Sequence, residues 1–315
     1  MIEIKALKIA TRESALAMWQ AEHVASQLRL RHPAMQISLC PMTTKGDQIL
    51  DRPLSQIGGK GLFLKELEQA MLAGQADCAV HSLKDVPMQL EPEFALAAIM
   101  RRASAFDALI VRDRNIQSLM QLPLCARIGS SSQRRQVQLH ALRPDFELID
   151  LRGNVNTRLR KLDAGEYDAI VLAQAGLDRL GFADRISQVL AAPEFLPAAG
   201  QGALAIECLS TRPEIAALLA DLADLETTTC VRAERSLAKA LEGSCQMPIA
   251  AFAELNDGHL RLQALLGDDA ARRHVRAELS GRADQAEALG FALAQKLREL
   301  AIAQLLVSQK IVGAH

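Results

Sequence analysis

The sequence predicts an α/β protein: two doubly wound α/β domains followed by a small α+β domain. Apolar strand-like runs alternate with helical runs over roughly the first two hundred residues, and the alternation restarts after about residue 105. In the last ninety or so residues, three successive strands lie between two helices. A chain of 315 residues, 50% of them hydrophobic, can supply cores for two or three domains.

The first domain opens with a strand, a helix of apolar residues at helical spacing, and a second strand. Gly74 marks the end of its next helix. The predicted strands are 2–11, 35–42 and 76–82, and the predicted helices are 13–32 and 61–74. Strands that alternate with helices in this way predict parallel sheets covered on both faces.

The second domain repeats the pattern, and the third departs from it. We predict strands at 125–130, 146–151 and 167–174, and helices at 132–142, 156–165 and 175–182. In the third domain, a helix at 226–243 precedes two strands within 248–269, which Asn256-Asp257-Gly258 joins as a hairpin. A strand at 272–281 and a helix at 284–301 close the chain.

Composition excludes several classes of protein. The net charge of −1 gives no general attraction to nucleic acid or to anionic membranes, and one Trp, one Tyr and eight Phe are few for base stacking. The first residues lack a cationic segment followed by an apolar run, and no stretch has the length of a membrane span. We therefore expect a cytoplasmic protein that binds neither nucleic acid nor membrane.

The six cysteines do not form a metal-binding pattern. No C-x-x-C pair occurs, so we expect no metal site, and no disulfides in a reducing compartment. Cys40, Cys78, Cys125 and Cys208 lie in apolar strand-like runs and are expected to be buried; Cys230 lies near a helix start. Cys245 lies in a loop, where the residues alone allow a packed thiol, half a disulfide, a metal ligand, a nucleophile or a point of attachment.

Cationic and hydroxyl side chains gather in five loops that follow predicted strands. They are Arg12 and Ser14, Lys84 with Asp85, Ser130 to Ser132 with Arg134 and Arg135, Arg152 with Arg158, and Arg179. A single such residue is explained by a solvated charge at a helix start. Five loops at equivalent strand ends instead predict a cleft for a ligand with many carboxylates or phosphates. Nucleotides fit less well, because no phosphate-binding glycine loop is present.

Several segments resemble the signature segments of the porphobilinogen deaminase (hydroxymethylbilane synthase) family. They are ATRESALA, the run from Thr44 to Glu68, HSLKDVP, GSSSQRRQ, the run from Arg152 to Leu180, PAAGQGALAIE and LEGSCQMPIA. The resemblance runs in order from about residue 7 to about residue 250. It implies two lobes of the two-lobed periplasmic-binding-protein type, residues 1–102 with 201–222 and residues 103–200, and a third domain, residues 223–315.

The resemblance also implies a chemistry. Members of the family join four porphobilinogen molecules head to tail with release of ammonia, on a covalently held dipyrromethane, and then hydrolyse the linear tetrapyrrole from it. Each pyrrole carries an acetate and a propionate, which accounts for the cationic loops. Loss of ammonia leaves an electron-poor azafulvenium-like species, whose positive charge a carboxylate can stabilise. The expected enzyme is a monomeric transferase of tetrapyrrole (haem and chlorophyll) biosynthesis whose product passes to uroporphyrinogen III synthase.

Residue roles follow from the matching motifs. Cys245 is implied as the thioether anchor of the dipyrromethane, and Asp85 as the catalytic carboxylate that also binds the pyrrole N–H groups. The residues implied to hold cofactor carboxylates are Lys84, Ser132, Arg134, Arg135 and Arg158. Those implied to hold substrate or the growing chain are Arg12, Ser14, Arg152, Arg179 and Gln201. Phe63 is either a stacking residue near the active pocket or a core residue.

The chain departs from the family pattern at Ser104, Ala105 and Phe106, where many members have a charged segment. A hinge or carboxylate contact made by those charges in other members is therefore not expected in this chain. Three alternatives remain beside the deaminase: a two-lobed anion-binding protein without catalysis, a phosphate-transferring enzyme, and a catalytically altered relative. The first gives Cys245 and Asp85 no role, and the second lacks a phosphate loop.

Overall fold

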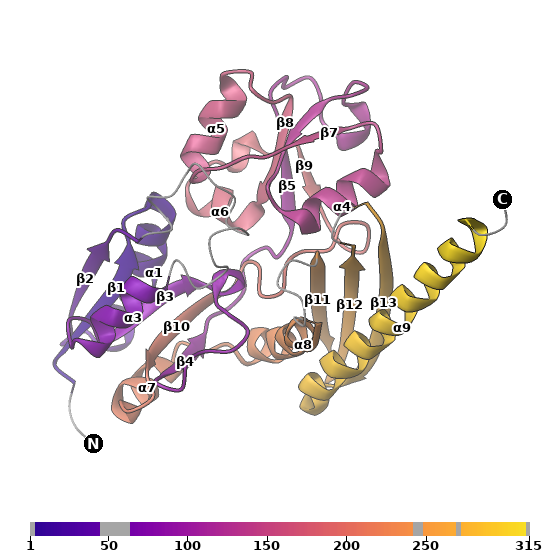
Figure 1. Cartoon of the computed structure of the whole chain (residues 1–315). Helices are drawn as coiled ribbons and strands as arrows, with labels where there is room; N and C mark the ends of the chain where they lie inside the picture. The colour runs from indigo at the N-terminus through magenta and orange to yellow at the C-terminus, as the bar shows by residue number, and fades with distance from the viewer. Residues whose placement is uncertain (1–3, 45–63, 242–247, 269–271, 313–315) are drawn as a thin grey trace.

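The computed structural model describes residues 4–44, 64–241, 248–268 and 272–312, with side chains described up to residue 304. Three sheets organise these residues (Figure 1). The first two are five-stranded and carry helices on both faces, and the third has three strands. We call the first two units the first and second lobe, and the last the third unit.

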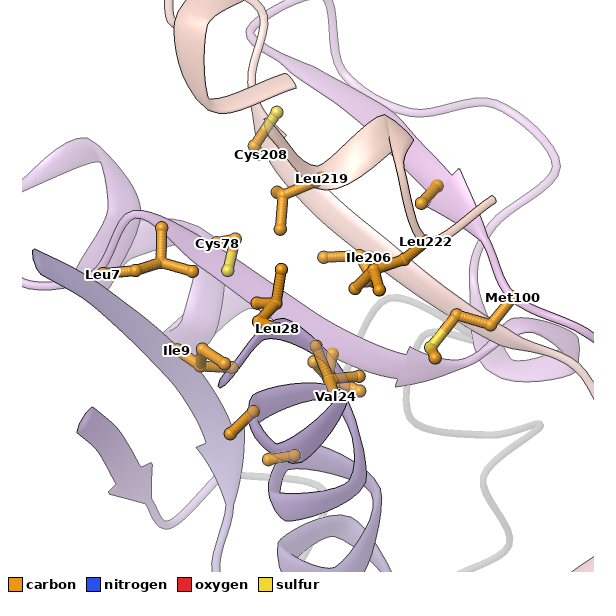
Figure 2. Close-up of a cluster of buried hydrophobic side chains, with 14 of the residues drawn as sticks. Leu7, Ile9, Val24, Leu28, Cys78, Met100, Ile206, Cys208, Leu219 and Leu222 are labelled. Carbon is orange, nitrogen blue, oxygen red and sulfur yellow. The ribbon is translucent and has the colours of Figure 1, made fainter. Parts of the chain in front are cut away.

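The first lobe is built on the sheet β2-β1-β3-β10-β4. Its strands are β1 (Ala6–Arg12), β2 (Gln36–Met42), β3 (Cys78–Ser82), β4 (Phe94–Ile99) and β10 (Leu204–Leu209), and its helices are α1 (Ala15–Arg31), α3 (Lys65–Leu72) and α7 (Pro213–Ala220). Leu7 and Ile9 of β1 pack against Val24 and Leu28 of α1 in a fully buried cluster (Figure 2). Ala10, on the other face, packs against α3. This alternation of side chains fixes which helix covers which face.

The second lobe is built on the sheet β7-β6-β8-β5-β9. Its strands are β5 (Asp107–Val111), β6 (Arg127–Gly129), β7 (Glu147–Ile149), β8 (Ala169–Ala173) and β9 (Gln188–Leu190), and its helices are α4 (Gln133–Leu142), α5 (Val155–Asp163) and α6 (Gln174–Arg179). Leu139 of α4 lies in the core on one face, whereas Leu159 of α5 and Leu177 of α6 lie in the core on the other.

The prediction of wholly parallel sheets is wrong at two strands. β10 is antiparallel to β3 and β4, and β5 is antiparallel to β8 and β9. The chain crosses between the lobes twice, at residues 100–106 and 191–203, which we call the crossing segments. A strand that follows a crossing starts at the edge where the parallel strands end, so Asp107 pairs with Ala173 and Leu204 pairs with Ser82.

The third unit is an antiparallel sheet packed against two helices. It comprises α8 (Leu225–Leu241), β11 (Ile249–Asn256), β12 (His259–Gly267), β13 (His274–Arg282) and α9 (Ala286–Val312). The predicted hairpin is confirmed: Asp257 and Gly258 have φ values of 48° and 75°, as a tight two-residue turn requires. The last helix extends beyond its predicted end.

One buried carboxylate connects both crossing segments to the third unit. Glu234 of α8 is fully buried and accepts hydrogen bonds from Arg102 at 2.6 and 3.0 Å. The same carboxylate accepts from the backbone N–H groups of Gly200 at 2.7 Å and Ala253 at 2.9 Å. Two backbone donors and one guanidinium satisfy this charge, as a buried carboxylate requires.

Candidate active site

A cavity of about 510 Å³ lies between the two lobes. Its described lining includes six cationic side chains and two carboxylates, Glu13 and Asp85. The cationic residues are Arg12, Lys84, Arg135, Arg152, Arg158 and Arg179. Such an excess of positive charge in a recess attracts a ligand with several anionic groups.

The sheet topology explains why residues far apart in sequence meet here. Arg12 ends β1, and Lys84 and Asp85 form a single helical turn directly after β3. Arg152 follows β7, and Arg158 lies on α5. All of these positions are at the ends of parallel strands or in the helices that follow them, the edge at which open α/β sheets bind ligands. Ser14, another lining residue, caps α1 by accepting from the N–H of Ala17 at 3.3 Å.

Burial shifts the pKa values of three lining cations downward. Burial lowers the pKa of Lys84 to about 8, although Asp85 beside it acts in the opposite direction. Burial, with Arg135 and Arg152 nearby, lowers the pKa of Arg158 to about 10. Burial alone lowers the pKa of Arg179 to about 10. The arginines stay charged at neutral pH, and a ligand with carboxylates would relieve their mutual repulsion.

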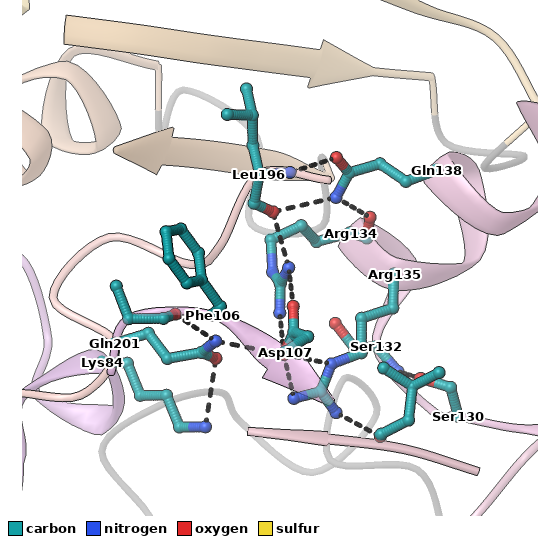
Figure 3. A network of polar contacts seen from close by, with 12 residues as sticks. Lys84, Phe106, Asp107, Ser130, Ser132, Arg134, Arg135, Gln138, Leu196 and Gln201 are labelled. Carbon is teal, nitrogen blue, oxygen red and sulfur yellow. Dashed lines mark hydrogen bonds and ion pairs between the residues drawn. The ribbon is translucent and has the colours of Figure 1, made fainter. Parts of the chain in front are cut away.

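Behind this lining lies a network centred on Asp107 (Figure 3). The fully buried Asp107 carboxylate accepts from Arg134 Nη1 and Arg135 Nη2, both at 2.7 Å. Gln201 donates to it at 3.1 Å and accepts from Lys84 Nζ at 3.4 Å. Burial would raise the pKa of Asp107, but the two arginines outweigh burial and hold it below its ordinary value. Asp107 therefore orients Arg135 directly and Lys84 through Gln201.

The structure thus distinguishes the sequence-predicted site residues that line the cavity from those that do not. Eight of them line the cavity: Arg12, Ser14, Lys84, Asp85, Arg135, Arg152, Arg158 and Arg179. Arg134 and Gln201 lie behind the lining, where Arg134 also donates to Leu196 O at 2.8 Å. Ser132 is the residue before α4, and its N–H donates to Ser130 Oγ at 3.3 Å. Cys245 and Phe63 lie outside the described residues.

Sequence reasoning missed Asp107 and Gly202. Asp107 is the one charged residue at the head of the apolar run DALIV, a signal of a buried charge with a specific partner. Gly202, on the second crossing segment, has φ +91°, and a Cβ there would lie 2.5 Å from Ser104 O. Glycine is required at this contact between the two crossing segments.

The departure at residues 104–106 forms an uncharged contact. Ser104 Oγ donates to Gln174 Oε1 at 2.6 Å. The Phe106 ring lies 5.3 Å from the ring of Phe252 on β11, at an angle of 57°. Ala105, Val137 and Ala250 belong to the same apolar cluster. In this chain, the first crossing segment therefore packs against the third unit through aromatic rings.

Three of the described cysteines are buried thiols that are held in the protonated form. Burial raises the pKa values of the Cys78 and Cys208 thiols, and raises that of Cys230 to about 12. The prediction that Cys125 is buried is wrong: it is exposed, because it lies in a turn before β6 with φ 54° rather than within the strand. Cys40 is partly buried.

Comparison with known families decides the identity. Residues 7–217 match the family described as "Porphobilinogen deaminase, dipyromethane cofactor binding domain", and residues 228–299 match "Porphobilinogen deaminase, C-terminal domain". The chain belongs to the porphobilinogen deaminase family. Deaminases of this family are transferases that make hydroxymethylbilane from porphobilinogen, and the cavity described above lies within the residues that match their cofactor-binding domain.

Individual deaminases are similar over nearly the whole chain. Porphobilinogen deaminase of Xanthomonas axonopodis pv. citri is 57% identical, covering 95% of this chain and 98% of its own. That of Stenotrophomonas maltophilia is 54% identical, covering 96% and 99%. Among solved structures, the methionine binding protein MetQ has a TM-score of 0.46 at 10% identity, covering 70% of this chain and 90% of its own. The Bordetella pertussis BvgS periplasmic VFT2 domain scores 0.41 at 15% identity, covering 70% and 87%.

The part of the chain that the structure describes contains no helix long and apolar enough to cross a membrane. Nor do its His, Cys, Asp and Glu side chains gather in a group of three or more that could hold a metal ion.

Proposed function

We propose that the cavity binds a dipyrromethane held covalently through Cys245, together with the growing pyrrole chain. The observation that supports this assignment is the convergence of six cationic side chains on one cavity that also contains Asp85. Pyrroles with acetate and propionate groups match this lining, since guanidinium groups pair with carboxylates through two parallel hydrogen bonds. When bound, the dipyrromethane supplies the nucleophilic pyrrole carbon from which the chain grows.

The location of the neighbouring residues supports Cys245 as the attachment point. Ala250, close to Cys245 in sequence, packs in one cluster with Ala105 of the first crossing segment and Val137 of α4. Val137 is two residues from Arg135, which lines the cavity. The buried thiols of Cys78, Cys208 and Cys230 are enclosed in apolar cores and cannot carry a ligand.

Each cavity residue then has a defined task. Lys84, Arg135 and Arg158 hold carboxylates of the dipyrromethane. Arg134 supports them from α4, and Ser132 from the position before that helix. Arg12, Ser14, Arg152 and Arg179 hold the carboxylates of incoming porphobilinogen or of the chain, and Gln201 keeps Lys84 in place. Asp85 accepts hydrogen bonds from pyrrole N–H groups and stabilises the positive charge that develops on the substrate as ammonia leaves.

We further propose the setting in which the enzyme works. Its domains are residues 1–102 with 201–222, residues 103–200 and residues 223–315. It acts in the cytoplasm as a monomer and passes its product to uroporphyrinogen III synthase. Gel filtration with light scattering measures the oligomeric state, and a dimer at micromolar concentration would contradict the proposed monomer.

Intact mass tests the attachment. The purified protein should exceed the mass of its sequence by two linked pyrrole units, and Cys245→Ser should lack this excess. Cys125→Ser is the matched control, because Cys125 is the exposed cysteine among those described and should keep the excess. An excess retained by Cys245→Ser would refute the anchor. Consumption of porphobilinogen, with product that cyclises to uroporphyrin I when left alone, tests the activity and excludes a catalytically altered relative.

A further inference from the structure

An aromatic ring of the first lobe lies against a cavity arginine of the second lobe. Arg179, at the end of α6, lines the cavity, and its Nη2 donates to Gly202 O at 2.7 Å. Its Cζ lies 5.6 Å from the centre of the Trp19 ring, on α1. This distance is within the range of cation–π attraction. The guanidinium is thus held between a ring of one lobe and a backbone carbonyl of the second crossing segment.

Trp19 is not a core residue. This residue, the sole tryptophan of the chain, is 38% exposed. It stacks on His23 one helical turn further on, with ring centres 5.1 Å apart and planes at 6°. Burial and the nearby Arg179 charge lower the pKa of His23, so its ring is neutral at neutral pH and adds no repulsion to Arg179.

We propose that Trp19 is a positioning residue that fixes the Arg179 guanidinium at the cavity for the porphobilinogen carboxylates. The inference rests on the proposed function, in which Arg179 holds substrate. An arginine side chain has much rotamer freedom, and each anchor that restricts it beforehand lowers the entropy lost when a carboxylate binds. Because α1 and α6 belong to different lobes, this contact exists only when the lobes are close together.

Steady-state kinetics of single and double variants test this role. Trp19→Leu should raise KM by about three- to tenfold and leave kcat within about twofold, because a cation–π contact of this kind affects binding rather than the chemical step. Trp19→Phe, which keeps a ring, should recover part of the loss. In an Arg179→Gln background, Trp19→Leu should add no further rise in KM. A full additional rise there would show that Trp19 acts independently of Arg179 and would overturn the proposal.

Fluorescence tests the contact without substrate. Since Trp19 is the only tryptophan, its emission reports this site alone. Arg179→Gln should change the emission, whereas Arg160→Gln, which removes an exposed arginine of the same lobe, should not. Unchanged emission in Arg179→Gln would refute the contact. A wild-type protein that does not consume porphobilinogen would instead refute the proposed function, so the two failures are distinguishable. Intact mass must show the same cofactor content in every variant.

Discussion

Arg135 donates to a single carboxylate oxygen of Asp107 from two nitrogens, Nε at 3.0 Å and Nη2 at 2.7 Å. Both side chains are buried, and Asp107 is the first residue of the strand that follows the crossing between lobes. A cation that lines the cavity is therefore fixed from behind by a carboxylate placed directly after the first crossing segment. The position of Arg135 depends on where the crossing segment delivers Asp107.

We expect Asp107→Asn to destabilise the protein by about 3–5 kcal/mol, because Arg134 and Arg135 would remain buried without their counter-charge. Urea unfolding of the two proteins measures the difference. Asp163→Asn is the control, since Asp163 pairs with Arg185 on an exposed surface and its loss should change stability far less. If both substitutions lowered the free energy of unfolding equally, the buried Asp107 network would stabilise the protein no more than an exposed ion pair does.

The same carboxylate predicts how stability depends on acid. The folded-state pKa of Asp107 lies below the value of about 3.9 expected in the unfolded chain. Its stabilisation is therefore fully present above about pH 4 and is lost as the pH falls through the folded-state value. Unfolding curves between about pH 5 and pH 3 should converge for wild type and Asp107→Asn as the pH decreases. A constant gap across that range would contradict the prediction.

Asp85→Ala should abolish turnover while the dipyrromethane stays bound. Removing a group that stabilises charge in the transition state costs about 10²-fold or more in kcat. The variant's intact mass should match that of the loaded wild type, and ammonia release from porphobilinogen measures turnover. Asp85→Glu keeps the charge and should retain part of the activity. Normal turnover by Asp85→Ala would remove the role assigned to this carboxylate.

Because Lys84 has a lowered pKa, we expect the dipyrromethane to be acquired more slowly at alkaline pH. Its pKa is lowered to about 8 by burial, so the ammonium loses its proton as the pH rises through this value and ceases to attract carboxylates. Cofactor-free protein supplied with porphobilinogen should gain its mass increment more slowly at pH 9 than at pH 7. Lys84→Arg keeps its charge over this range and should show no such slowing. Equal rates for wild-type protein at the two pH values would exclude Lys84 as a titrating contact.

Local patterns in the sequence predict most of the helices and strands and the cationic loops, because each depends on nearby residues. Helix α7 and strands β4, β5, β9 and β10 are not among the predicted elements. The dipeptide Asp257-Gly258 was enough to predict the hairpin. The position of Asp85 directly after a predicted strand was enough to predict that it lies at the cavity. The sequence does not reveal that β5 and β10 run antiparallel, because that direction follows from long-range crossings. For the same reason Arg134 and Arg135, neighbours in sequence, could not be separated into one residue behind the cavity and one lining it.

The first crossing segment contacts the third unit through the rings of Phe106 and Phe252. Phe106→Ala should lower stability by about 1–3 kcal/mol, because it removes packing against Phe252 in a partly buried cluster. In a protein of this size, each kcal/mol shifts Tm by about 2–4 °C or less. Phe291→Ala, at a phenylalanine of α9 that is 52% exposed, is the control and should have a smaller effect.

A double-variant cycle with Phe252→Ala then isolates the ring contact. The two substitutions should combine to less than the sum of their separate effects, by about 0.5–1.5 kcal/mol, since each removes the same pair. If the two stability changes were strictly additive, the two rings would not interact with each other. A measured coupling would show that apolar packing joins the first crossing segment to the third unit. Phe106 directly precedes Asp107, so this ring contact lies beside the carboxylate that orients Arg135.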